Sequence, residues 1–301
     1  MRDATREAAD SGKLVALVGP TASGKTEAAL RLAERIGGEI VSVDSVQVYR
    51  AFDVGSGKPT AAELQRAPHH LVSILAPDEA IDAAGFAKVA DAAIAGVRAR
   101  GKVPVLCGGT FLWAKALLQG LVEAPRGSDD IRARHRAIAD RDGRAALHAR
   151  LREVDAASAD RLHPNDLLRV SRALEVFELG GAPLSALQAG HAFQSPRYDA
   201  ALFAVRRSPE ALTARIEDRA RAWLEQGWIE EVRALLEQGH GTSRAMGSVG
   251  YREVAAFLRG ELPRDALLGA IVRSTRIFAR RQRTWLNHEP VTWIDEAGAS
   301  L

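Results

Sequence analysis

The stretch LVALVGPTASGKTEAAL, Leu14–Leu30, decides the fold class of this 301-residue chain. An apolar run typical of a strand leads into Gly19-x-x-x-x-Gly24-Lys25-Thr26, which matches the Walker A pattern, and a helical pattern follows. Glycines let backbone N–H groups turn inward, and the start of a helix adds partial positive charge, so such a loop holds phosphate. We predict that Lys25 contacts the terminal phosphate and that Thr26 ligates Mg²⁺. The predicted phosphate-binding residues are Gly19, Pro20, Thr21, Ala22, Ser23, Gly24, Lys25 and Thr26.

Strand and helix patterns alternate through the first third of the chain. Apolar runs typical of strands lie at 13–18, 39–43, 71–75 and 103–106, and helical patterns between them include 25–36 and 83–100. Strands separated by helices predict a parallel, doubly wound sheet, in which ligands bind at the carboxyl ends of the strands.

The second half of the chain predicts an insertion into this α/β fold. The pattern is helical from 131 to about 180, with loop-rich stretches on both sides. Strand character returns at 201–207, helices follow, and a short strand is expected at 291–295. We therefore expect an α/β, P-loop-type parallel sheet flanked by helices over 1–122 together with 199–301. The expected insertion over 123–198 is an all-helical domain.

Composition excludes several classes of protein. No run of 18 apolar residues is present, and the polar N-terminus lacks the apolar centre of a signal peptide, so we expect a cytoplasmic protein without a membrane span. We also expect a monomer. A single cysteine, Cys107, excludes a disulfide framework and a cysteine-built zinc site. The net charge of +3 indicates no polyanion partner by itself, although lysine is absent after Lys115 and arginine replaces it. Two explanations stay open for this pattern: a compositional bias toward arginine, or phosphate binding by some of the arginines.

Two further strand ends carry polar residues that are candidates for the active site. Asp44 ends the second predicted strand, where it is either a common turn residue or a carboxylate beside the phosphate site that takes a proton or holds a metal-bound water. Thr110 follows Gly108 and Gly109, a pair that permits close approach of a ligand or simply makes a tight turn into a helix. The chain lacks the Asn-Lys-x-Asp base reader of GTPases, whereas a small-molecule kinase of the P-loop class stays open.

The last predicted helix has one basic face. Arg273, Arg276, Arg280 and Arg283 share it, and Ile271, Phe278 and Trp285 fall on the opposite face. No acidic residue occurs between Asp265 and Glu289, whereas a merely solvated helix usually carries both signs of charge. This pattern favours a polyphosphate partner, above all a nucleic acid.

The motifs together resemble one family closely, the tRNA dimethylallyltransferases, also called tRNA isopentenyltransferases. They span nearly the whole chain: GPTASGKT, DSVQVYR, GSGKP, GGTFLWAKALLQGL, HPNDLLRVSRALEV, RIEDR, VGYRE and TRIFARRQRTWL. This family prenylates the N6 amine of the tRNA adenosine on the 3′ side of the anticodon. The resemblance implies that the loop holds the diphosphate of dimethylallyl diphosphate and that no nucleoside triphosphate is consumed.

The resemblance also implies roles for individual residues. Asp44 would accept the N6 proton, Thr110 would bond the target base, and Arg219 of RIEDR would join Lys25, Thr26 and Mg²⁺ at the leaving pyrophosphate. The inserted helices would bind the anticodon stem-loop. The implied tRNA contacts are Asp44, Ser45, Val46, Gln47, Thr110, Arg132, Leu168, Arg169, Val170, Ser171, Arg172, Gly247, Ser248, Val249, Gly250, Tyr251, Arg252, Arg280, Arg281, Gln282, Arg283, Thr284, Trp285, Leu286 and Asn287.

The chain departs from the family pattern at three positions. Trp113 and Phe278 stand where the family commonly has Tyr, and Asn287 stands where it usually has Arg, which weakens one expected RNA contact. Two other classes remain open: a P-loop small-molecule kinase that uses the loop for ATP, and a non-catalytic RNA-binding module with a relic loop.

Overall fold

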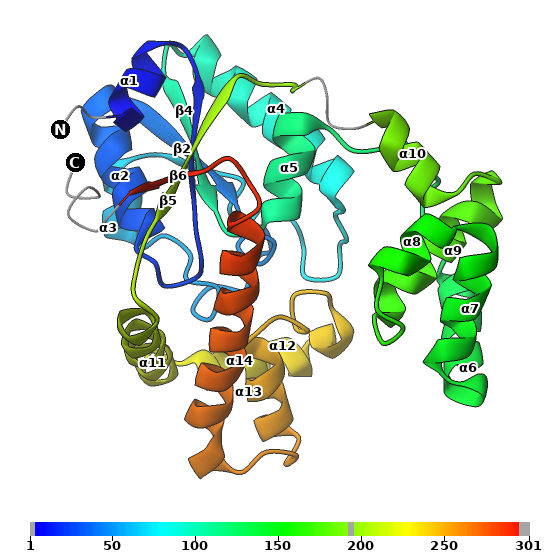
Figure 1. The fold of residues 1–301 in the computed structure, drawn as a ribbon. Coiled ribbons are helices and arrows are strands. Elements are labelled where there is room, and N and C mark those ends of the chain that lie inside the picture. The colour runs from blue at the N-terminus through cyan, green and yellow to red at the C-terminus, as the bar shows by residue number, and fades with distance from the viewer. Residues whose placement is uncertain (1–3, 192–195, 295–301) are drawn as a thin grey trace. The chain divides into compact units, whose positions relative to one another are not determined.

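The core of the molecule is a six-stranded parallel sheet, so the predicted α/β fold class is confirmed (Figure 1). The computed structural model describes residues 4–191 and 196–294. The strand order is β3-β2-β4-β1-β5-β6, and every pairing is parallel. The strands are β1 Leu14–Val18, β2 Gly38–Val43, β3 His69–His70, β4 Val103–Gly108, β5 Ala200–Val205 and β6 Thr292–Ile294.

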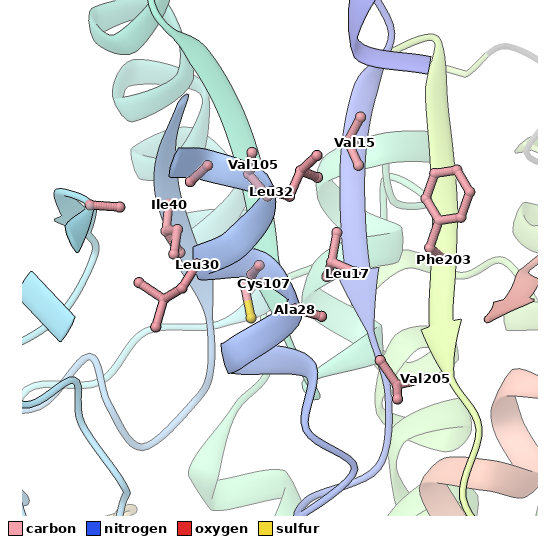
Figure 2. Packing of buried hydrophobic residues seen from close by; sticks show 13 residues of the cluster. Val15, Leu17, Ala28, Leu30, Leu32, Ile40, Val105, Cys107, Phe203 and Val205 are labelled. Atoms are coloured by element: carbon pink, nitrogen blue, oxygen red, sulfur yellow. The ribbon is translucent and has the colours of Figure 1, made fainter. Parts of the chain in front are cut away.

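Strand β1 is central and fully buried because helices cover both faces of the sheet. All five of its residues are apolar and buried, which is the pattern of a parallel strand with no solvent face. Helix α2 (Lys25–Ile36) packs on one face, where its Leu30 and Leu32 belong to one buried cluster with Ile40, Val15 and Val105 of the strands (Figure 2). Helix α4 (Ala83–Ala99) contacts β2 and β4. The predicted helix over 25–36 is confirmed at both ends.

One predicted strand is wrong. The sequence predicts a strand at 71–75, but the structure has only the two-residue strand β3 just before this run. β3 pairs with β2 at Ile40 and Val41. Leu71 and Ser73 have left-handed φ values of 64° and 55°, which interrupt an extended ladder. Only one isolated parallel bridge, from Tyr49 to Leu75, continues the pairing among the described residues.

The remaining helices of this unit lie around the sheet and beyond the carboxyl ends of its strands. Helices α11 to α14 gather at these carboxyl ends (Figure 1), and α14 packs against α11 and α13. Among the described residues, no helix combines the length and the apolar composition that a bilayer crossing requires. The helices are α1 Ala4–Asp10, α3 Ala61–Arg66, α5 Phe111–Gln119, α11 Pro209–Glu225, α12 Trp228–Glu237, the 3₁₀ turn η1 His240–Thr242, α13 Tyr251–Leu258 and α14 Arg264–Leu286.

The chain divides into two compact units, and the second is entirely helical where it is described. The first contains residues 1–118 and 197–301, and the second contains 119–196. The second unit has its own apolar core, which includes Leu147, Leu151 and Val170. Its helices are α6 Asp129–Asp142, α7 Arg144–Val154, α8 Ala156–Arg161, α9 Leu167–Gly180 and α10 Leu184–His191.

Candidate active site

The phosphate loop connects β1 to α2 and is held by tight backbone turns. Gly24 precedes the helix with φ of 96°, a conformation that favours glycine, and Ala22 also has a left-handed φ of 64°. A Cβ on Gly19 would lie 2.8 Å from the Ser23 hydroxyl, so a larger residue there would displace the Ser23 side chain. Lys25 folds back over the loop, with its Nζ donating to the Pro20 carbonyl at 3.4 Å.

Three arginines contact this loop from the segment that follows β5. Arg207 Nε donates to the Ser23 carbonyl at 2.6 Å, and Arg215 Nε donates to the Ala22 carbonyl at 3.0 Å. Arg219 Nη2 donates to the Thr21 hydroxyl at 2.5 Å, and its guanidinium lies 4.6 Å from the centre of the Trp223 ring. Sequence reasoning identified Arg219 and missed the other two. The position of Arg207 just after a strand that adjoins β1 was the signal available for it.

The loop concentrates positive charge in a desolvated space. Burial lowers the pKa of Lys25, and the Arg219 guanidinium adds to this effect, while the Asp44 carboxylate opposes it. Burial and the Arg215 charge lower the pKa of Arg219 to about 10. Burial raises the pKa of the neighbouring Cys107 thiol to about 11, so this cysteine is a neutral thiol at physiological pH. A bound anion such as diphosphate would relieve the repulsion between the two cations.

Asp44 lies where the sequence placed it, at the carboxyl end of β2. Its Oδ1 accepts hydrogen bonds from the N–H groups of Val46, at 2.9 Å, and Gln47, at 3.2 Å. This Asx turn fixes one carboxylate oxygen. Asp44 borders the cavity that contains Lys25 and Arg219.

Thr110 belongs to the same cluster of strand ends. Its hydroxyl accepts from Ser45 N–H at 3.0 Å and donates to Ser45 Oγ at 3.2 Å. The turns after β2 and β4 are therefore bonded to each other.

Two cavities meet at these residues. One has a volume of about 430 Å³ and is bordered by Thr110, Phe278 and Arg281, and the other has about 590 Å³ and is bordered by Thr26 and Cys107. The arrangement suits a reaction in which a phosphate-bearing donor and a second molecule approach from two sides. The residues common to both cavities are Thr21, Lys25, Asp44, Ser56, Arg219 and Trp223.

A carboxylate that sequence reasoning missed shapes the wall of these cavities. Glu231 of α12 accepts from the N–H groups of Asp53, at 2.9 Å, and Val54, at 2.7 Å, and from the Tyr251 hydroxyl at 2.7 Å. The loop that it holds also engages Gln47, whose Nε2 donates to the Gly57 carbonyl at 2.8 Å. No local motif marks Glu231, because the two backbone N–H groups that it binds lie 178 and 177 residues earlier in the chain.

Helix α14 separates the cavity at Thr110 from a second groove. The four arginines of its basic face border a groove against α11 of about 240 Å³, so their predicted common face is confirmed. Phe278, Arg281 and Gln282 instead border the 430 Å³ cavity. Trp285 stacks on Phe111 at a ring distance of 4.5 Å.

The proposed tRNA contacts fall into two groups by exposure. Leu168 is 84% exposed at the start of α9, and Arg169 is exposed beside it. Arg132 and Arg172 both pair with Glu175, which is fully buried, so these two also stabilise the helical unit. The other group has buried side chains: Val170, Ser171, Tyr251, Gln282 and Leu286.

Few protein groups could hold a metal ion here. Thr26 and Asp44 border the same cavity, and the described residues contain no cluster of three or more His, Cys, Asp or Glu side chains that could hold a metal. This sparse set fits Mg²⁺, which keeps several waters and commonly binds through one or two protein groups together with substrate phosphates.

Comparison with known proteins identifies the family. A "tRNA dimethylallyltransferase" of Sorangium cellulosum is 61% identical over 283 residues, covering 94% of this chain and 90% of that protein, and one of Anaeromyxobacter dehalogenans (strain 2CP-C) is 52% identical, covering 94% of each. The crystal structure of the tRNA isopentenylpyrophosphate transferase of Bacillus halodurans superposes with a TM-score of 0.69 at 35% identity, covering 94% of this chain and 89% of that one. Residues 47–289 match the IPP transferase family. With these identities over nearly the full chain, the protein belongs to the tRNA dimethylallyltransferase (IPP transferase) family.

Proposed function

We propose that this protein transfers the dimethylallyl group of dimethylallyl diphosphate to the N6 amine of the tRNA adenosine on the 3′ side of the anticodon, and releases diphosphate. The observation that carries the proposal is the pair of cavities that share Lys25, Asp44 and Arg219. A leaving-group site and a proton acceptor thus lie at one junction, which is what alkylation of an amine requires. Family membership supports the choice of substrates.

The 590 Å³ cavity suits the diphosphate of the donor. Lys25, Arg219 and the N–H groups at the start of α2 would stabilise the negative charge that develops on pyrophosphate as the carbon–oxygen bond breaks. The Thr21 hydroxyl accepts from Arg219, which aims the guanidinium at the loop. Thr26, and Asp44 through water, would hold Mg²⁺ with the diphosphate, where the ion would neutralise charge on the leaving group.

The 430 Å³ cavity suits the acceptor adenine. The N6 lone pair is delocalised into the ring, so attack on carbon needs removal of an N–H proton, and Asp44 is the carboxylate at the junction. Thr110 borders this cavity and would bond the base. The adenine would leave its stack to enter, at a cost of about a few kcal/mol.

The tRNA itself would meet several basic surfaces. Arg281 borders the acceptor cavity, and Arg280 and Arg283 border the groove against α11. No ion pair joins these three to a carboxylate within residues 4–191 and 196–294. Exposed Leu168 and Arg169 would contact the anticodon arm from the helical unit. We place this activity in the cytoplasm, carried out by a monomer.

One experiment separates this function from the alternatives. The protein is incubated with unmodified tRNA and either labelled dimethylallyl diphosphate or labelled ATP, and transfer to RNA is scored. Prenyl transfer to the adenosine next to the anticodon supports the proposal. Phosphoryl transfer from ATP would indicate a kinase, and tRNA binding without either transfer would indicate a non-catalytic module. Both of these results would refute the proposal.

A further inference from the structure

We infer that Gln282 is a positioning residue for the transfer reaction. Its side-chain amide joins the phosphate loop to the Gly109–Thr110 turn, and so sets the spacing between the leaving group and the acceptor base. The inference rests on the proposed function and assigns to it a residue that acts through its bonds to the protein backbone, at the wall of the 430 Å³ cavity.

The amide of Gln282 spans two strand ends. Thr21 N–H donates to Gln282 Oε1 at 2.8 Å, and Gln282 Nε2 donates to the Gly109 carbonyl at 2.9 Å. Thr21 follows β1 and Gly109 follows β4, and these strands are neighbours in the sheet. Gln282 is only 5% exposed, so water does not readily replace either bond.

The fit around this amide is tight. A Cβ added to Gly109 would lie 2.5 Å from Gln282 Nε2 and 3.3 Å from the Gly19 carbonyl. The first distance is below that of real Cβ contacts, so a side chain at position 109 would force the Gln282 amide to shift. The Gln282 side chain therefore fills the space between the loop and the turn and is bonded to both of them.

The connection continues to the proposed base. Thr110 follows Gly109 directly, and its hydroxyl bonds both the backbone and the side chain of Ser45, next to Asp44. Gln282 thus links the turns that carry Thr21, Thr110 and Asp44. In the proposed function, Thr21 lies at the leaving diphosphate, Thr110 bonds the adenine, and Asp44 accepts the N6 proton. A misplacement of about 1 Å at such a site costs up to roughly 100-fold in rate.

A direct RNA contact is the competing role for Gln282. Gln282 borders the 430 Å³ cavity together with Arg281, but both polar atoms of its side-chain amide are bonded to the protein's own backbone. With only 5% of its surface exposed, Gln282 offers a nucleotide little side-chain surface. The two roles predict different measurements, because an RNA contact acts on affinity and a positioning contact acts on the chemical step.

The test compares Gln282→Leu and Gln282→Glu with the wild type. For the leucine variant we expect a single-turnover prenyl transfer rate reduced by about 10- to 100-fold, with tRNA Kd within about threefold and an unchanged salt slope. The glutamate variant keeps an acceptor for Thr21 N–H but loses the donor to Gly109 until its carboxyl is protonated. Its rate relative to wild type should therefore rise as the pH falls.

Leu267→Ala is the control for stability, since Leu267 is fully buried on α14 and borders none of these cavities. It should lower the melting temperature without slowing single-turnover transfer. Slowing by this control as large as that by Gln282→Leu would overturn the inference, because general loosening of α14 would then explain both.

A double-mutant cycle with Gly109→Ala gives an independent measure. If Gln282 acts through the turn, Gly109→Ala slows transfer by clashing with Nε2, and Gln282→Ala relieves that clash, so the double variant is no slower than the slower single variant. Multiplicative losses would overturn the inference, as would a Gln282→Leu variant with a wild-type rate or with its whole loss in tRNA affinity. Absence of prenyl transfer by the wild type would instead overturn the proposed function.

Discussion

Replacing Asp44 by asparagine separates its chemical role from its structural one. Asp44 Oδ1 accepts from Val46 N–H and Gln47 N–H, and an asparagine Oδ1 can accept the same two bonds. Asp44→Asn should therefore fold with nearly wild-type stability while losing a proton acceptor. The single-turnover rate should fall by about 10²- to 10⁴-fold, the usual contribution of a general base, with tRNA affinity within a few-fold.

The alanine variant gives the matched control. Asp44→Ala also removes the two hydrogen bonds that form the Asx turn. Two hydrogen bonds to a partly exposed carboxylate together contribute about 1–3 kcal/mol to the free energy of unfolding. We expect the same loss of rate, and in addition a lower free energy of unfolding in urea. Rapid-quench transfer from labelled dimethylallyl diphosphate to saturating tRNA measures the rate. An asparagine variant that transfers at close to the wild-type rate would refute the assignment of the base.

Three further predictions concern charge. Arg219→Ala should depress turnover with little change in the salt dependence of tRNA binding. Arg280→Ala and Arg283→Ala should each weaken tRNA binding and reduce its salt slope by at most about one unit for each phosphate that the variant no longer binds. An unchanged slope in both of these variants would contradict the proposed contacts with the RNA backbone. Burial lowers the pKa of Lys25, and bound diphosphate favours the charged forms of Lys25 and Arg219, so pyrophosphate affinity measured by calorimetry should fall as the pH rises through the lowered pKa of Lys25 and through about 10, the pKa of Arg219. Affinity that rises over this range would contradict the placement of these two cations. Glu175→Ala leaves two arginines without their buried partner and should destabilise the helical unit by roughly 3 kcal/mol in urea unfolding, whereas a change below about 0.5 kcal/mol would show that the cluster contributes little.

The sequence by itself determined the features that are encoded locally. The phosphate loop between β1 and α2, the position of Asp44 at the end of β2 and the common face of the four arginines on α14 all follow from short motifs or from periodicity. Such patterns depend on neighbouring residues and on helix geometry, and the structure confirms these placements. The motifs also identified the family, which the comparisons confirm.

Only the tertiary structure decided which distant residues complete the site. Gln282 bonds Thr21 across 261 positions, and Glu231 bonds Asp53 across 178. The packing of α11 also decided that Arg215 contacts the phosphate loop. Nothing local distinguishes these side chains from other polar residues on amphipathic helices, because their roles arise only when the helices close over the carboxyl ends of the sheet. For the same reason the periodicity of α14 revealed its basic face but not the cavity that each face borders.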